Sequence, residues 1–281
     1  MAEAEAVKAN ELGREKSAGG LVQYSVSDGI ALLTLNDPPA NTYTYEMMRE
    51  LDRSILDARM DVDAHVIVIT GGGEKFFSAG ANIRTLSEMT PEFKYYFCLH
   101  ANETLSRLEQ TPKLVIAALN GHTVGGGLEI ALAADLRLAR RGAGKMGLPE
   151  ITLGVLPGTG GTQRLVRVVG KSRAIELMTT GELFDFERGQ ELGLVNHIYE
   201  AGTGAEFMEQ VISYARQFTL PGKAARAAGR IKRSVQSGAE IPFEYGLALE
   251  RELQQQLFQS EDAREGLDAY VQKRKPQFKG R

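Results

Sequence analysis

Short apolar runs that end at glycine-rich loops recur along this chain of 281 residues and constrain its fold more than any other feature. The runs at 65–70 (HVIVIT) and 114–119 (LVIAAL) are typical of buried strands. Helical patterns follow at 92–109 and 127–135, and a short strand pattern lies at 136–140. Strand, loop and helix therefore alternate, and the sequence predicts an α/β architecture with a buried sheet.

The two ends of the chain differ from this middle part. Two β-rich runs flank Asp28-Gly29 within residues 21–35, which is a strong hairpin signal. A helical pattern follows, with Met47, Leu51, Ile55 and Leu56 on one face. After about residue 210 only helix-like patterns remain, including one long run from 244 to 273.

These shifts predict three parts. Residues 1–20 form a flexible N-terminal arm, residues 21–210 form the core with the active site, and residues 211–281 form a helical region. The amphipathic faces of that region must pack on the body of the chain or on a partner subunit.

Composition excludes several functional classes. A net charge of −3 and a pI near 5.9 give no reason to expect a nucleic acid or an anionic membrane as the main partner. The single cysteine, Cys98, excludes an intrachain disulfide framework and a cysteine-based zinc cluster. The four histidines show no metal-ligand spacing, so no metal site is expected. No apolar run is long enough to span a bilayer, and the first twenty residues lack the pattern of a secretory signal, so a cytoplasmic location is expected.

Residues 120–161 hold two glutamates in an apolar, glycine-rich setting. Glu129 follows the triplet Gly125-Gly126-Gly127 and lies in an apolar run, whereas Glu150 follows Pro149. Glycines before a helix let a ligand approach the main chain, and the first N–H groups of a helix suit an anion or a developing oxyanion. A tight turn packed on a core helix would explain the glycines alone. A glutamate in an apolar run favours function, because buried glutamate needs a partner or a role.

A second glycine loop at 71–84 (GGGEKFFSAGANIR) also carries small residues that would let backbone N–H groups face a ligand. Neither this loop nor the GTGG segment at 158–161 matches a dinucleotide fingerprint or a P-loop.

Several stretches together resemble the crotonase superfamily, most closely the enoyl-CoA hydratases. They are FFSAGANI, NGHTVGGGLEIALAADLRLA, GLPEITLGVLPGTGGTQRL, GELFDFERGQELGLVNHI and SEDAREGLDAYVQKRKPQF. The resemblance runs from about residue 22 to 279 and implies a spiral of ββα repeats with C-terminal helices that mediate trimerisation. Such a protein is a homotrimer or a dimer of trimers.

The resemblance also implies an acyl-CoA substrate whose thioester oxygen lies between the N–H groups of Ala81 and Gly126, an oxyanion hole. By the family pattern Glu129 activates water and Glu150 delivers a proton to Cα, so that water adds to the 2,3-double bond of an enoyl-CoA. Coenzyme A enters as part of the substrate, and no other cofactor is implied. A double-bond isomerase or a hydrolase of the same superfamily remains an alternative.

Other positions are assigned by the same resemblance. The expected acyl-CoA contacts are Lys75, Ala81, Asn82, Ile83, Arg84 and Gly126, together with Tyr270 and Lys273, which would reach the CoA of a neighbouring subunit. Asn82 stands where the family usually has aspartate. The usual start of the helix near residue 45 is replaced here by Thr42, Tyr43 and Tyr45. A second aromatic group follows at Tyr95, Tyr96 and Phe97. The two groups indicate either an altered acyl pocket or ordinary aromatic packing.

Two further alternatives remain. His122 lies inside the central motif, where packing explains it better than a serine–histidine mechanism. One branch of the superfamily binds RNA; the candidate basic segments are 223–233 and 273–275, and the acidic overall balance disfavours this role.

Overall fold

The computed structural model describes residues 20–281, so the expected arm at 1–20 lies almost entirely outside the described residues. The strands are β1 (Val22–Ser27), β2 (Ile30–Leu35), β3 (Val66–Gly71), β4 (Phe76–Ser78), β5 (Leu114–Leu119), β6 (His122–Val124), β7 (Leu136–Arg140), β8 (Lys145–Gly147), β9 (Phe184–Asp185) and β10 (His197–Tyr199). They form a six-stranded sheet, β1-β2-β3-β5-β7-β10, and a four-stranded sheet, β4-β6-β8-β9.

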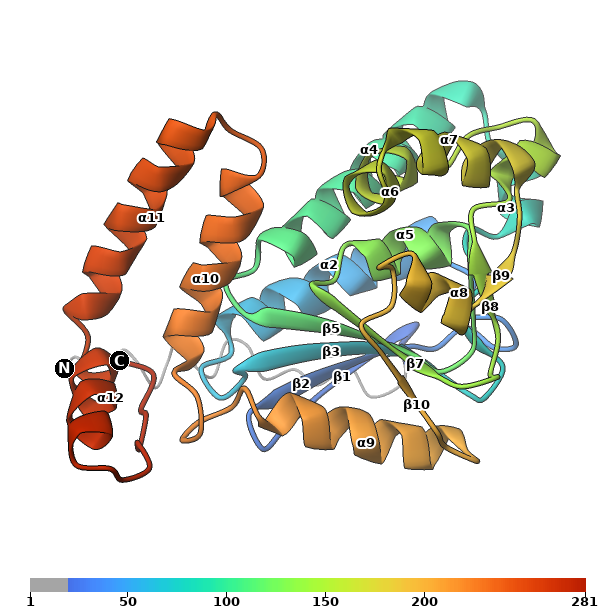
Figure 1. Cartoon of the computed structure of the whole chain (residues 1–281). Coiled ribbons are helices and arrows are strands. Elements are labelled where there is room, and N and C mark those ends of the chain that lie inside the picture. The colour runs from blue at the N-terminus through green and yellow to red at the C-terminus, as the bar shows by residue number, and fades with distance from the viewer. Residues whose placement is uncertain (1–19) are drawn as a thin grey trace, which may run out of the picture.

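The helices fill the connections between strands and form the C-terminal region (Figure 1). They are α2 (Tyr45–Met60), α3 (Ile83–Glu88), α4 (Pro91–Gln110), α5 (Gly126–Leu132), the 3₁₀ helix η1 (Glu150–Leu153), α6 (Gly161–Val169), α7 (Lys171–Thr180), α8 (Phe186–Glu191), α9 (Gly204–Arg216), α10 (Ala225–Gly238), α11 (Phe243–Phe258) and α12 (Glu261–Val271).

From β3 to β8, successive strands alternate between the two sheets. Strands β3, β5 and β7 pair in parallel in the larger sheet, and the strands that follow each of them, β4, β6 and β8, pair in parallel in the smaller one. Helices α3 and α4 follow β4, α5 follows β6, and η1 and α6 follow β8. Each turn of the chain is thus a ββα unit, and the predicted α/β spiral is confirmed.

The predicted hairpin is also confirmed. Strands β1 and β2 pair antiparallel, with Ser27 opposite Ile30. Asp28 and Gly29 have φ values of 52° and 79°, the left-handed pair that a two-residue type I′ turn requires.

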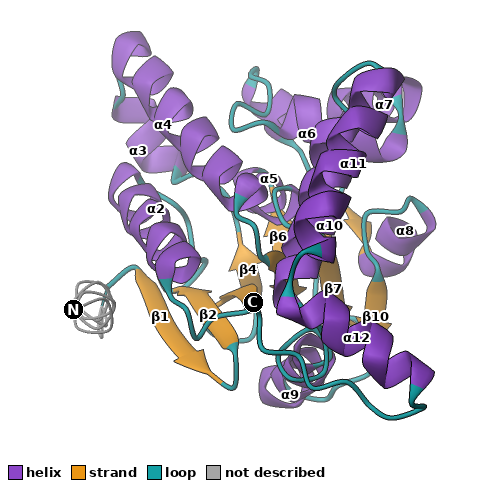
Figure 2. Cartoon of the chain, turned by 90° about the vertical axis from the view of Figure 1, so that its left-hand side faces the viewer, coloured by secondary structure: helices purple, strands orange, loops and turns teal. Residues whose placement is uncertain are grey.

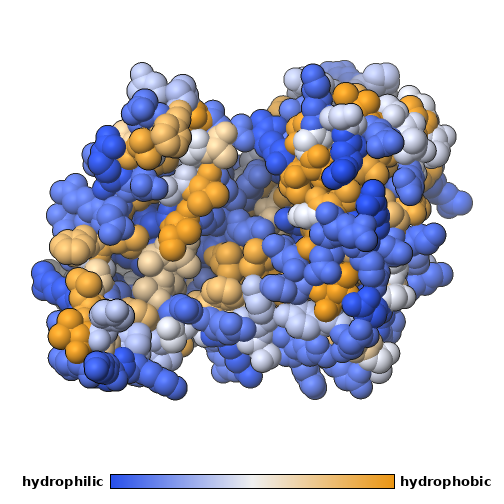
Figure 3. All heavy atoms as spheres, in the orientation of Figure 1, coloured by the Kyte–Doolittle hydropathy of each residue, from blue (hydrophilic) through white to orange (hydrophobic). Residues whose placement is uncertain are grey.

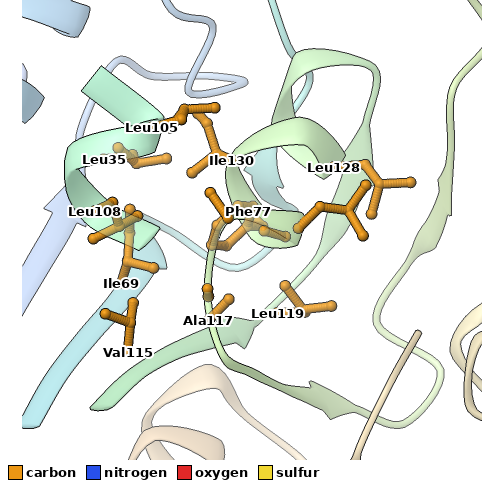
Figure 4. Packing of buried hydrophobic residues seen from close by; sticks show 14 of the residues in the cluster. Leu35, Ile69, Phe77, Leu105, Leu108, Val115, Ala117, Leu119, Leu128 and Ile130 are labelled. Atoms are coloured by element: carbon orange, nitrogen blue, oxygen red, sulfur yellow. The ribbon is translucent and has the colours of Figure 1, made fainter. Parts of the chain in front are cut away.

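The larger sheet is covered on both faces, as its apolar strands predict (Figure 1). Along β3, Ile67 and Ile69 face the main core with α2, α4 and α5, whereas Val66 and Val68 face α9. Figure 4 shows Phe77 of β4 among the side chains of β5 and α5 in the main core. The loops and helices at the end of this sheet are therefore supported by a closely packed core.

Two details of the helices differ from the sequence-based predictions. In α2, Met47, Leu51 and Ile55 are buried, but Leu56 is 37% exposed, because adjacent helical positions are turned about 100° from each other. The expected continuous run from 244 to 273 is two helices, α11 and α12. The chain turns at Ser260, whose hydroxyl caps α12 by accepting from the N–H of Ala263 at 3.1 Å.

The C-terminal helices divide between the body and an extension. Helix α9 packs against the sheet, so the expected boundary at residue 210 falls within a core helix. Helix α10 is tied to the body by a buried ion pair, with Lys232 Nζ 2.9 Å from Asp135 Oδ2. Helix α11 packs against α10 on the side away from the rest of the body (Figure 1), and Figure 2 views the molecule from that side. None of the helices within residues 20–281 combines the length and apolar character needed to cross a bilayer.

Candidate active site

The first loop of the candidate site is held by Tyr43. The Tyr43 N–H donates to the carbonyl of Gly80 at 2.9 Å, and the Asn82 N–H donates to the carbonyl of Tyr43 at 3.2 Å. These two bonds form a parallel bridge opposite Ala81. In such a bridge the residue between the two bonds turns its own N–H away from the partner strand, so the Ala81 N–H is left for another acceptor.

The second loop brings Gly126 to the same place. Gly125 has φ 56° and ψ −130°, which L side chains rarely adopt, and ends β6 so that α5 begins at Gly126. The first N–H of a helix has no acceptor within the helix. A Cβ on Gly80 would lie 2.8 Å from the Gly126 nitrogen, so the two loops are in direct contact. The structure thus joins the two predicted oxyanion-hole residues.

Gly126 also has no room for a side chain. A Cβ there would lie 2.2 Å from Cε1 of Tyr43 and 2.3 Å from its hydroxyl. The Tyr43 ring therefore packs directly on the α-carbon of Gly126.

Glu129, on α5, is 2% exposed and firmly held. Its Oε1 accepts hydrogen bonds from the N–H groups of Thr159 and Gly161, each at 2.7 Å. Burial raises the pKa of Glu129, and these two N–H donors oppose the rise because they stabilise the carboxylate. The glycines of the GTGG segment let the main chain come this close to the side chain.

Glu150 has a different environment. It begins η1 directly after Pro149, and its Oε1 would lie 2.9 Å from a Cβ on Gly125. Its Oε2 is buried and finds no hydrogen-bond partner within the described part of the chain. Burial raises the pKa of Glu150 to about 7, and the nearby charge of Glu129 adds to the rise.

The two carboxylates therefore form a coupled pair beside two N–H groups. Lys94 on α4 lowers the pKa of both, but less than burial raises them. Two nearby carboxylates resist ionising together, so such a pair can supply one acid and one base to a substrate bound between them.

The expected CoA contacts of the first loop lie before β4 (Lys75) and at the start of α3 (Asn82, Ile83 and Arg84). Asn82 caps α3 by accepting from the Thr85 N–H at 3.2 Å, a task that asparagine and aspartate perform equally well. Ile83 and Arg84 are exposed on the first turn of α3. Lys75 is exposed and lies over the Phe76 ring, 5.5 Å from its centroid.

The expected C-terminal contacts lie elsewhere in the chain. Tyr270 is 86% exposed near the end of α12, and Lys273 follows two residues after that helix. Figure 1 places α12 at the opposite end of the molecule from α3. Within one subunit, therefore, the structure does not bring Tyr270 and Lys273 to the site.

The aromatic cluster divides into two groups. Tyr43 and Phe97 are buried, with ring centroids 5.8 Å apart, whereas Tyr95 and Tyr96 are more than half exposed. Tyr45 packs edge-to-face against Phe93 and His100. Only the first group belongs to the candidate site.

Sequence reasoning missed the roles of Thr159 and Gly161, which hold Glu129, and of the Tyr43 hydroxyl, which lies 2.9 Å from Oγ1 of Thr159. The GTGG segment was the only signal for the first two.

His122 is confirmed as a packed residue. Its ring lies 5.3 Å from that of Phe76, and its Nδ1 accepts from the Lys145 N–H at 3.1 Å. Across residues 20–281, no cluster of three or more His, Cys, Asp or Glu side chains is placed to hold a metal ion.

Comparison with known proteins gives a consistent result. The sequence model of the enoyl-CoA hydratase/isomerase family matches residues 25–281. A probable enoyl-CoA hydratase of Bacillus subtilis is 36% identical over 260 residues, which cover 92% of this chain and 98% of that protein. The 2,3-dehydroadipyl-CoA hydratase of Escherichia coli is 38% identical over 258 residues, covering 90% and 96%.

A solved structure extends the similarity to the fold. The enoyl-CoA hydratase of Geobacillus kaustophilus superimposes with a TM-score of 0.90 at 44% identity, covering 94% of this chain and 98% of that one. The family match over residues 25–281 includes the candidate site and the C-terminal helices. The chain therefore belongs to the enoyl-CoA hydratase/isomerase family of the crotonase superfamily and is an enzyme of the hydratase type.

Proposed function

We propose that this enzyme adds water reversibly across the 2,3-double bond of an enoyl-CoA to give a 3-hydroxyacyl-CoA. The observation that carries the proposal is the contrast within the carboxylate pair beside Ala81 and Gly126. Glu129 accepts two backbone hydrogen bonds that favour its ionised form, and Glu150 has a raised pKa of about 7 that favours its protonated form. A hydratase needs one base and one acid in these states.

The reaction follows from this arrangement. Glu129 takes a proton from water, and the hydroxide oxygen bonds to Cβ while the π electrons move toward the thioester oxygen. The N–H groups of Ala81 and Gly126 stabilise the resulting enolate, each by roughly 3–4 kcal/mol. Glu150 gives its proton to Cα, and the pair ends with the proton on Glu129. Dehydration runs the same steps in reverse.

Substrate binding is part of the proposal. Lys75, Asn82, Ile83 and Arg84 would contact the CoA moiety, with Tyr270 and Lys273 supplied by a neighbouring subunit. Coenzyme A enters only with the substrate, and no other cofactor takes part. A cytoplasmic location belongs to the same proposal, and cell fractionation tests it.

A homotrimer, alone or paired into a hexamer, is supported by the surface of the C-terminal helices. Between α10 and α11 lies an open groove of about 750 Å³. Exposed apolar side chains cover these helices: Ile231, Val235, Phe243, Tyr245 and Phe258. Figure 3 shows apolar side chains beside the hollow that separates these helices from the body. Light scattering after size-exclusion chromatography tests this part, and Ile231→Glu is expected to dissociate the assembly.

The test of the reaction uses ultraviolet absorbance of the conjugated enoyl thioester. With crotonyl-CoA and then longer, branched and cyclic enoyl-CoAs, we expect the band to disappear as 3-hydroxyacyl-CoA forms. Release of CoA thiol would instead establish a hydrolase. Gain of the band from a 3-enoyl-CoA, without reaction of any 2-enoyl-CoA, would establish an isomerase.

A further inference from the structure

Tyr43 contacts both loops that carry the Ala81 and Gly126 N–H groups, and also the segment that holds Glu129. Its backbone bonds flank Ala81, and its ring packs on the α-carbon of Gly126. Its hydroxyl lies 2.9 Å from Oγ1 of Thr159, and the side chain is only 3% exposed. A buried hydroxyl needs a hydrogen-bond partner, and Thr159 supplies it, whereas phenylalanine would fill nearly the same volume with no polar atom to satisfy.

Thr159 connects the Tyr43 hydroxyl to Glu129. The Thr159 N–H donates to Glu129 Oε1 at 2.7 Å, and the Thr159 hydroxyl also lowers the pKa of Glu129. Burial raises the pKa of Tyr43 well above its ordinary value, so the phenol keeps its proton and acts as a donor. If Tyr43 donates to Thr159, the hydroxyl proton of Thr159 is free to point at the Glu129 carboxylate. The chain of donors then runs from Tyr43 through Thr159 to Glu129.

We propose that Tyr43 is a positioning residue that, through Thr159, holds Glu129 as an oriented carboxylate ready to take a proton from water. This inference rests on the proposed hydratase function for the role of Glu129 as base. Tyr43 itself neither donates a proton to the substrate nor takes one from it. Its effect is on the charge and direction of Glu129.

Other charged and titratable groups also surround Glu129. Lys94 on α4 lowers the pKa of Glu129, and the charge of Glu129 in turn raises the pKa of Glu150 on η1. Arg164 on α6 lies 3.4 Å from the Thr159 carbonyl and is paired with Glu109 at 2.9 Å. Cys98 of α4 lies beside Tyr43. Replacing Tyr43 by phenylalanine leaves all of these in place, so a change in the titration of Glu129 reports the hydroxyl alone.

The test compares Tyr43→Phe with Tyr24→Phe. Tyr24 also bears a hydrogen-bonded hydroxyl, 3.2 Å from Asp61, on the remote strand β1. We expect Tyr43→Phe to move the acid limb of kcat/KM to higher pH and to lower kcat at neutral pH roughly fivefold to tenfold, with little change in KM. Tyr24→Phe is expected to leave both the pH profile and kcat unchanged.

Thr159 variants separate positioning from simple packing. Thr159→Val is expected to shift the profile as Tyr43→Phe does, and the double variant is expected to match Thr159→Val, because both changes break one chain. Thr159→Ser keeps the hydroxyl and is expected to retain the wild-type profile. The proposal would be overturned if the effects of the two single variants added up in the double variant. It would also be overturned if Tyr43→Phe left the pH profile of kcat/KM unchanged.

A second readout does not depend on activity. The ¹³C resonance of the Glu129 carboxyl, assigned by its loss in Glu129→Gln, is followed against pH in the wild type and the two phenylalanine variants. We expect a higher pKa in Tyr43→Phe only. An unchanged pKa would refute the positioning role. If the wild type failed to hydrate any enoyl-CoA, the proposed function would fall, while this titration would still decide whether Tyr43 controls Glu129.

Discussion

Glu129 and Glu150 lie in the same site but in two differently built regions. Glu129 projects from a helix inside the core and accepts two N–H donors from a glycine-rich segment. Glu150 opens a single 3₁₀ turn whose next residues are exposed, and one of its oxygens is buried without a partner in the described chain. Burial raises the pKa of both, so the hydrogen-bond donors decide which of them more readily gives up its proton. Local backbone geometry thus divides the roles of two chemically identical side chains.

The largest expected effect comes from neutralising either carboxylate. Glutamine keeps the volume, and at position 129 its oxygen still accepts the two N–H bonds. Glu129→Gln loses the base and Glu150→Gln the acid, so each is expected to lower kcat roughly 10²–10⁴-fold. Steady-state hydration of crotonyl-CoA measures this. If either variant kept more than a tenth of wild-type kcat, its carboxylate would not have the assigned role.

A smaller loss of kcat is expected when only the loop that carries the Gly126 N–H is disturbed. In Gly126→Ala the new Cβ would overlap the Tyr43 ring and displace the Gly126 N–H, so kcat is expected to fall about 10²–10³-fold. Gly238→Ala is the matched control, because among the described residues nothing lies within 4 Å of a Cβ there. Equal activity of the two variants would contradict the role of Gly126.

The pH dependence sharpens the comparison further. Hydration starts with Glu129 ionised and Glu150 protonated. Dehydration starts with Glu129 protonated and Glu150 ionised, so the pair carries one proton in both directions. Plots of kcat/KM against pH are therefore expected to be bell-shaped with the same midpoints in both directions. The alkaline limb is expected near pH 7, where Glu150 loses its proton. Limbs that moved in opposite directions for the two reactions would contradict a shared proton.

The smallest effect is on stability. Folding raises the pKa of Glu150 from 4.5 to about 7, so between these pH values the folded state holds a proton that the unfolded chain has lost. The free energy of unfolding of the wild type should therefore fall as pH rises from 5 to 8. Glu150→Gln has no such proton, so its free energy of unfolding should fall by about 1 kcal/mol less than that of the wild type. The difference is small because the carboxylate is only partly buried. Urea denaturation of both proteins at the two pH values measures the difference.

Much of the fold could be predicted because its signals are local. The apolar runs that became β3 and β5 and the Asp28-Gly29 turn are short-range patterns. The break before α12 was not predicted, although Ser260 with two acidic residues after it is a local helix-start signal. The exposure of Leu56 was not visible, because the width of a buried helix face is set by what packs on it.

The candidate site was only partly predictable, because some of its features are local in the sequence and others depend on long-range contacts. Glu129 and Glu150 stand out as carboxylates in apolar surroundings. The contacts that tell them apart are long-range: Tyr43 meets Thr159 across the site, and Thr159 and Gly161 meet Glu129 from a later segment. No local pattern specifies such contacts. They follow from the spiral that stacks these loops.

The division of roles is tested most directly by locating the proton. Isotope-edited infrared difference spectra at pH 6, one unit below the pKa of about 7 for Glu150, detect a protonated glutamic acid group. The band is predicted to vanish in Glu150→Gln and to persist in Glu129→Gln, because burial rather than the neighbouring charge is the main cause of the raised pKa of Glu150. A band that vanished in Glu129→Gln and persisted in Glu150→Gln would contradict the account.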